Sequence, residues 1–145
     1  MKQKQEKAIE LFREGYNCAQ SVLAVFAEDL GMEQEKALQF SNGFGGGMGG
    51  MQKTCGAVSG AVMVIGSYYY SRESFEKAGM KDAVQTFFHR FTKKHGAIDC
   101  LALTGFDFND PFQKQQALDE NLYEEKCQLY IRSSIEILQA ILSLE

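Results

Sequence analysis

The sequence is poor in several residues and patterns on which common sites depend. Its 145 residues include one proline and two histidines, and none of the four cysteines forms a Cys-x-x-Cys pair. Two histidines exclude a histidine-rich metal site, and the missing Cys-x-x-Cys excludes both a thioredoxin-type motif and a zinc ribbon or knuckle. No Ser/His/Asp set and no carboxylate pair presents itself either. Any site built from the cysteines must therefore be assembled by the tertiary fold.

Basic runs and long hydrophobic runs are missing as well. Binding to nucleic acid draws its affinity from clustered Lys and Arg, so a net charge of -4 without a basic run argues against a nucleic-acid partner. The longest apolar run, residues 57–65, is less than half of the roughly 20 residues that span a bilayer, which predicts a core helix and no membrane partner. The charged N-terminus lacks the apolar segment of a signal peptide. We therefore expect a cytoplasmic protein.

The pattern of apolar residues predicts an all-α fold. With 45% hydrophobic residues, the chain is large enough to bury a core without disulfides, and we expect a single all-helical domain over residues 1–145. Helical periodicity predicts a bundle of five or six helices, at about 3–14, 18–30, 33–42, 52–70, 71–94 and 124–143. In the fourth, Gly56 and Gly60 lie one turn apart and would let another backbone approach closely. We expect that helix, which follows a glycine-rich loop, to be central and buried.

Each of the four cysteines stands where the sequence also indicates the start of a helix. Cys18 follows the N-cap residue Asn17, while Cys55 and Cys100 follow other capping residues. Cys127 precedes an apolar helical pattern whose start is poorly marked. A helix N-terminus has unpaired N–H groups and partial positive charge, which stabilise a thiolate. Alternatively, each cysteine is a small buried hydrophobic residue, in which case burial would raise its pKa.

The glycine-rich stretch, residues 43–50, contains the spacing Gly-x-Gly-x-x-Gly at Gly45, Gly47 and Gly50. A dinucleotide site needs a strand before this motif and a βαβ unit around it, but here a helix is predicted to precede it. We therefore do not expect a dinucleotide cofactor. Two interpretations remain: an ordinary connector, or a loop that turns backbone N–H groups toward an anion or a thiolate.

His95 lies near the predicted end of a helix, five residues before Cys100. It could accept a proton from that thiol or ligate a metal. A solvated histidine that is stabilised by the helix dipole is the other interpretation.

The order of these features resembles a known family. Cys18, the glycine-rich loop, the segment Cys55-Gly56-Ala57-x-x-Gly60, and then Cys100 and Cys127 are similar to the pattern of the C_GCAxxG_C_C family of redox-active proteins. The resemblance covers nearly the whole chain from Tyr16 onward. One departure is visible, because the family name has Gly-Cys-Ala where this chain has Cys-Gly-Ala.

The resemblance implies a redox class without a substrate. It implies that the four cysteines are the redox or ligand set, and that glycines supply the backbone which lets the helices bring the sulfurs together: Gly45, Gly46, Gly47 and Gly60. Four cysteines allow three disulfide connectivities, and the clear helix starts at Cys18 and Cys55 favour that pair.

Three functions remain open at this point. The first is thiol–disulfide exchange or electron transfer, with a redox protein or a small-molecule thiol or disulfide as partner. The second is a module in which the cysteines bind a metal or an iron–sulfur cluster. The third is a helical interaction protein, for example a homo-oligomer, in which the cysteines only pack. The sequence does not specify a cofactor.

Overall fold

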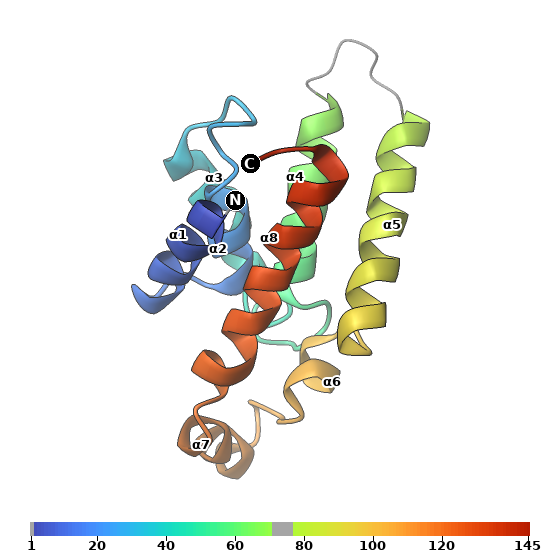
Figure 1. The fold of residues 1–145 in the computed structure, drawn as a ribbon. Helices are drawn as coiled ribbons and strands as arrows, with labels where there is room; N and C mark the ends of the chain where they lie inside the picture. Colours follow the sequence, from blue (N-terminus) through green and yellow to red (C-terminus); the bar gives the residue numbers. More distant parts are fainter. Residues whose placement is uncertain (1, 71–76) are drawn as a thin grey trace.

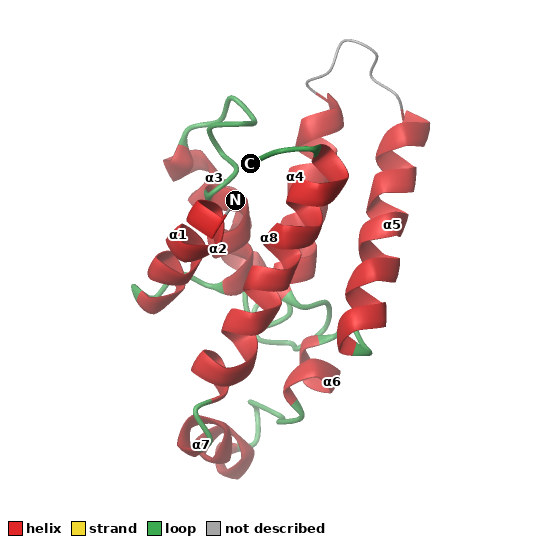
Figure 2. Cartoon of the chain, viewed as in Figure 1, coloured by secondary structure: helices red, strands yellow, loops and turns green. Residues whose placement is uncertain are grey.

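The computed structural model describes residues 2–70 and 77–145. These residues form eight α-helices, and no strand is found among them (Figures 1 and 2). The helices are α1 (Lys2–Arg13), α2 (Cys18–Ala24), α3 (Gln34–Ser41), α4 (Gly56–Tyr70), α5 (Lys77–His95), α6 (Cys100–Thr104), α7 (Pro111–Asp119) and α8 (Gln128–Leu142). A 3₁₀ turn, η1 (Asn42–Phe44), follows α3, and a π turn, η2 (Tyr123–Cys127), precedes α8.

The all-α class was predicted correctly, but the predicted number of five or six helices was wrong, because the described residues form eight. The predicted helix over residues 18–30 ends at Ala24, and tight turns follow, in which Phe26 N–H donates to Leu23 O and Ala27 N–H to Ala24 O. The predicted helix over 52–70 begins at Gly56. Two further helices, α6 and α7, have only 5 and 9 residues, too few to produce a clear apolar period. Part of the predicted 71–94 helix, residues 71–76, lies outside the described residues.

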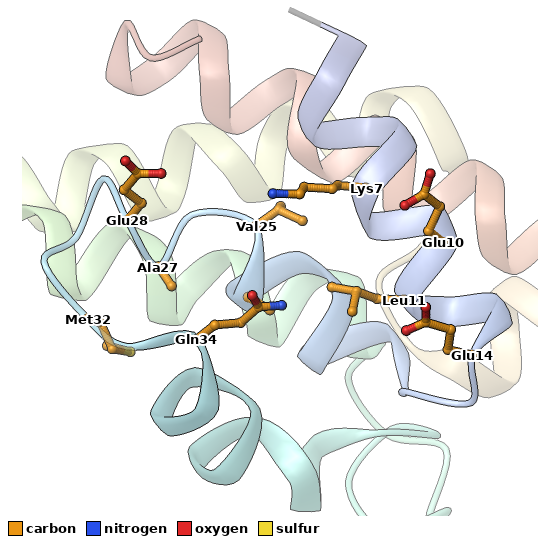
Figure 3. A pocket seen from close by; sticks show the side chains of 10 residues that line it. Lys7, Glu10, Leu11, Glu14, Val25, Ala27, Glu28, Met32 and Gln34 are labelled. Carbon is orange, nitrogen blue, oxygen red and sulfur yellow. The ribbon is translucent and has the colours of Figure 1, made fainter.

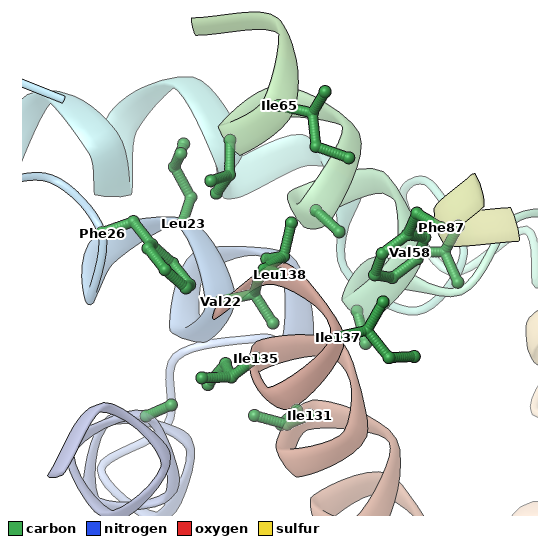
Figure 4. Packing of buried hydrophobic residues seen from close by; sticks show 14 of the residues in the cluster. Val22, Leu23, Phe26, Val58, Ile65, Phe87, Ile131, Ile135, Ile137 and Leu138 are labelled. Carbon is green, nitrogen blue, oxygen red and sulfur yellow. The ribbon is translucent and has the colours of Figure 1, made fainter. Parts of the chain in front are cut away.

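The core lies where α2, α4, α5 and α8 meet (Figure 4). Each helix contributes fully buried side chains, among them Val22 from α2, Val58 from α4, Phe87 from α5 and Leu138 from α8. Helix α4 packs against the other three, as predicted for a central helix. This core fixes the N-terminal ends of α2 and α4 next to each other.

Helices α2 and α4 approach so closely because α4 has glycine where they touch. A β-carbon at Gly60 would lie 3.0 Å from Ala19 O and 3.2 Å from the side chain of Val22. Such distances are tighter than side chains normally accept, so the two backbones are in direct contact. The close approach predicted from Gly56 and Gly60 is confirmed.

Candidate functional site

All four cysteines line one cavity of about 450 Å³. They come from separate parts of the chain: Cys18 from the start of α2, Cys55 from the residue before α4, Cys100 from the start of α6 and Cys127 from the end of η2. None of them forms a disulfide in this structure. The fold thus brings together four thiols that are far apart in sequence.

Cys18 is held by a complete N-terminal cap. The Asn17 side chain accepts from Gln20 N–H at 2.9 Å, and the Gln20 side chain accepts from Asn17 N–H at 3.0 Å. This reciprocal pair is a capping box, and it fixes Cys18 as the first residue of α2, as predicted. Gly45 packs against the cap, because a β-carbon there would lie 2.4 Å from Asn17 Cβ.

Cys55 and Cys100 are placed side by side by a short backbone pairing. Thr54 and Asp99 form an isolated antiparallel bridge. Next to it, Cys55 N–H donates to Ile98 O at 2.8 Å, and Cys100 N–H donates to Lys53 O at 2.6 Å. The bridge therefore fixes the starts of α4 and α6 relative to each other.

Cys127 does not begin a helix, contrary to the expectation. It is the last residue of the π turn η2, and its backbone is helical, with φ -60° and ψ -40°, as is that of Gln128 after it. The turn continues directly into α8, so the free N–H groups of a helix start are not available to this sulfur. A π turn is a rare variant that frequently marks functional sites.

The side chains of Cys18 and Cys127 interact, and each shifts the pKa of the other. The interaction with Cys18 lowers the pKa of Cys127, burial opposes this shift, and the nearby positive charge of Lys126 adds to it. The pKa of Cys18 is raised well above its usual range, first because of its interaction with Cys127 and then because of burial. The helix start at Cys18 predicted a stabilised thiolate, and this prediction is wrong, because Cys127 and not Cys18 has the lowered pKa of the pair.

The other two thiols are protonated at neutral pH. Burial raises the pKa of Cys55 to about 12, although the N–H groups of Ala57 and Val58 hydrogen-bond to it and oppose this shift. Burial is also the main reason why the pKa of Cys100 rises to about 11. A hydrogen bond from Gln52 acts in the opposite direction.

Gln52 is a site residue that sequence reasoning missed. Its buried side chain donates to Phe106 O at 2.7 Å, accepts from Phe108 N–H at 2.8 Å and has its amide nitrogen 4.0 Å from Cys100 Sγ. It therefore links the loop before α4 to the segment after α6 and positions Cys100. Nothing in the sequence around Gln52 distinguishes it from a loop glutamine.

The glycine-rich stretch wraps against the residues that precede Cys55. Gly46 and Gly47 line the cavity, and both have positive φ, at 61° and 70°. A β-carbon at Gly47 would lie 2.5 Å from Lys53 N, and the Gly47 carbonyl accepts from that same N–H at 3.0 Å. The stretch therefore needs glycine here for close backbone packing and for its left-handed conformation. Gly45 supports the cap of α2 and does not itself line the cavity.

His95 is not among the residues that line the cavity. The centroid of its ring lies 4.7 Å from that of Phe91 and 4.9 Å from that of Tyr130. Its Nε2 is buried without a hydrogen-bond partner. Burial, together with the charge of Lys94, lowers the pKa of His95. The interpretation as a solvated histidine is therefore wrong for this ring nitrogen.

A second cavity, of about 330 Å³, lies between α1 and the segment around α2 and α3 (Figure 3). Its charged side chains include Lys7, Glu10, Glu14 and Glu28, and no cysteine lines it. The thiol chemistry is therefore located in the first cavity.

Neither a metal site nor a membrane-spanning helix is found in the described ranges 2–70 and 77–145. No group of three or more Cys, His, Asp or Glu residues there surrounds a point that could hold a metal ion. No helix in this part of the chain has the length and apolar character needed to cross a membrane.

The fold and the site define an all-helical protein with four free thiols around one cavity. Residues 16–141 match the family described as "Putative redox-active protein (C_GCAxxG_C_C)". Because the match covers most of the chain, the protein belongs to this family, as the order of its cysteines and glycines indicated. The comparisons with curated proteins and with solved structures found no match.

Proposed function

We propose that the protein is a thiol–disulfide redox protein in which Cys18 and Cys127 form the reversible disulfide. The observation that carries this proposal is that both side chains line one cavity, where each shifts the pKa of the other. A disulfide between them requires Cα atoms within about 7 Å of each other. Cys55, which sequence reasoning paired with Cys18, is held near Cys100 by the hydrogen bonds from Cys55 N–H to Ile98 O and from Cys100 N–H to Lys53 O.

The proposed reaction begins at Cys127, whose pKa is lowered. Its thiolate attacks one sulfur of a disulfide substrate, the substrate's S–S bond breaks, and the first thiolate leaves with the electron pair and takes up a proton. Once Cys127 is in the mixed disulfide, the interaction that most raises the pKa of Cys18 is gone, so Cys18 loses its proton and attacks the Cys127 sulfur. The second substrate thiol is released, so that two cysteine thiols are oxidised and one disulfide is reduced to two thiols.

Cys55 and Cys100 keep their protons during this cycle. Their pKa values of about 12 and about 11 leave almost no thiolate at neutral pH. The thiolate is the nucleophile in exchange, so these two cysteines react slowly. We assign them to the walls of the cavity, beside the reactive pair.

The test is a count of free thiols, combined with peptide mapping, before and after mild oxidation. We expect the reduced protein to go from four free thiols to two, with Cys18 and Cys127 linked. Cys18→Ser and Cys127→Ser should each abolish the intramolecular link. Cys55→Ser and Cys100→Ser are matched controls, and in both variants the link should still form. A Cys18–Cys55 link, or four thiols that survive oxidation, would contradict the proposal.

A second candidate is a metal or cluster module, because all four sulfurs line one cavity, although in this structure they surround no point that could hold a metal ion and would have to move closer together. Four cysteines are a usual ligand set for zinc and for iron–sulfur clusters. Elemental analysis of the purified protein, together with its visible spectrum, tests this candidate. Bound zinc or iron that is lost in each of the four Cys→Ser variants would favour a metal or cluster over the disulfide.

A further inference from the structure

The cavity is walled mainly by apolar and aromatic side chains. Five aromatic rings line it: Phe12, Tyr16, Phe108, Tyr123 and Tyr130. Tyr123 stands between two of the others, with its ring centroid 6.2 Å from that of Phe12 and 6.3 Å from that of Phe108. Apolar walls with a few polar groups, and a volume of about 450 Å³, are typical of a pocket for a small molecule.

Glu124 is the one charged side chain among the described residues that line the cavity. Its carboxylate pairs with Arg13 at 3.4 Å. Lys126, the other cation nearby, donates to Thr104 O at 3.5 Å and does not line the cavity. An anionic ligand would therefore meet a carboxylate and aromatic rings in the lining, while the charge of Lys126, which acts on Cys127, lies outside the lining.

We propose that the oxidant of the Cys18–Cys127 pair is a small, uncharged, aromatic or apolar disulfide, and that the cavity discriminates against disulfides that carry carboxylates. This inference rests on the proposed function and names its substrate class. A carboxylate that enters the cavity loses its hydration without gaining a cation, which is costly, whereas an uncharged ring gains contact with the aromatic wall. The reaction is the exchange given above, in which the entering disulfide is reduced to two uncharged thiols.

The experiment compares two aromatic disulfides that differ in charge. 4,4′-Dithiodipyridine is uncharged at pH 7.5, and 5,5′-dithiobis(2-nitrobenzoate) carries two carboxylates. The rate of Cys18–Cys127 disulfide formation is measured with each reagent and divided by the rate of thiol reaction in the denatured protein, which corrects for intrinsic reactivity. We expect the corrected rate for the uncharged reagent to be higher by about tenfold or more.

Two matched variants locate the origin of the preference. Glu124→Gln removes the carboxylate that pairs with Arg13, so the guanidinium is free to bind a carboxylate of the reagent. The corrected rate with the dianionic reagent should therefore rise severalfold. Glu125→Gln makes the same change of charge at an exposed neighbour that does not line the cavity, and it should leave the ratio of the two rates unchanged.

The possible outcomes distinguish a failure of the proposed substrate class from a failure of the proposed disulfide. Equal corrected rates for the two reagents, or equal effects of Glu124→Gln and Glu125→Gln, would overturn the inference while the disulfide still forms. A faster reaction with cationic cystamine than with the uncharged reagent would also overturn it, because the cavity would then select positive charge. If neither reagent links Cys18 to Cys127, the proposed function itself fails, and the inference fails with it.

Discussion

Gly56 lies directly against Cys18. A β-carbon on Gly56 would be 3.0 Å from Cys18 Cβ and 2.8 Å from Ala19 N. The start of α4 thus packs directly against the start of α2, with no side chain between the two backbones. This contact also explains why glycine follows Cys55 in this chain, where the family name has the order Gly-Cys-Ala: the position after Cys55 is the one that touches Cys18.

Gly56→Ala should therefore destabilise the fold. The backbone of α2 must shift to admit the methyl group, and overpacking of this kind costs roughly 1–3 kcal/mol. Gly66→Ala is the matched control in the same helix, because a β-carbon at Gly66 meets nothing within 4 Å. Removing a glycine from a helix interior there should stabilise by roughly 0.5–1 kcal/mol. Urea denaturation measures both changes, and losses of equal size in the two variants would show that the α2–α4 contact is not tight.

Local signals in the sequence predicted the part of the site that local interactions build. The cap at Asn17 involves only residues 17–20, so the start of α2 at Cys18 could be predicted correctly. Gly56 and Gly60 are one turn apart, and their close approach to α2 follows from that spacing. These features depend on neighbours in the chain, which is why the sequence reveals them.

The features that were missed depend on contacts between distant segments. The approach of Cys127 to Cys18 results from the packing of α8 on α1 and α2, which no local pattern encodes. The π turn before α8 is likewise not distinguishable from an α-helix by apolar period. Gln52 gains its role from partners near residues 100–108, and an isolated polar residue in a loop gives no hint of them.

Alkylation at neutral pH should be fastest at Cys127. Its lowered pKa gives it the largest thiolate fraction of the four cysteines, while the pKa values of Cys18, Cys55 and Cys100 are raised. Iodoacetamide labelling, followed by peptide mass spectrometry, measures the order. Cys18→Ala removes the interaction with Cys127 and should shift the pH profile of Cys127 labelling to higher pH, whereas Cys55→Ala should not. Labelling of all four cysteines only in denaturant would indicate that they are structural.

Gln52→Ala should cost more stability than the loss of an ordinary surface glutamine. The variant removes the hydrogen bonds to the part-buried groups Phe106 O and Phe108 N–H, and only Phe106 O keeps another donor, the Thr104 hydroxyl at 3.4 Å, so the cost is about 1–3 kcal/mol. Gln115→Ala is the control, because its amide bonds to Asp119 at 2.9 Å on an exposed face, where substitutions change stability by roughly 0.5 kcal/mol or less. Thermal denaturation measures both.

A second readout separates positioning from stability. Gln52 lowers the pKa of Cys100 through its hydrogen bond, so Gln52→Ala should shift the pH profile of Cys100 labelling to higher pH. If the profile stays unchanged while stability falls, Gln52 supports the loops without acting on the thiol.

The fold should lose stability in alkaline solution because of its buried thiols. Cys55 and Cys100 have pKa values of about 12 and about 11 in the fold, against an ordinary value of 9.0. Below pH 9 both states hold these protons. Above it the unfolded chain releases them first, so stability decreases as pH rises toward 11 or 12. Each thiol contributes a slope of up to about 1.4 kcal/mol per pH unit in this window.

Cys55→Ala should therefore flatten the dependence of unfolding free energy on pH above 9, measured by urea denaturation at a series of pH values. Val58→Ala is the matched control, because it removes a buried side chain from the same helix without removing a titrating group. Val58→Ala should lower the free energy of unfolding at every pH and leave its slope above pH 9 unchanged. Tyr123 and Tyr130, whose pKa values are also raised, contribute to that slope in every variant. An unchanged slope in Cys55→Ala would mean that the Cys55 thiol ionises as easily in the fold as in the unfolded chain, and that burial does not protect it.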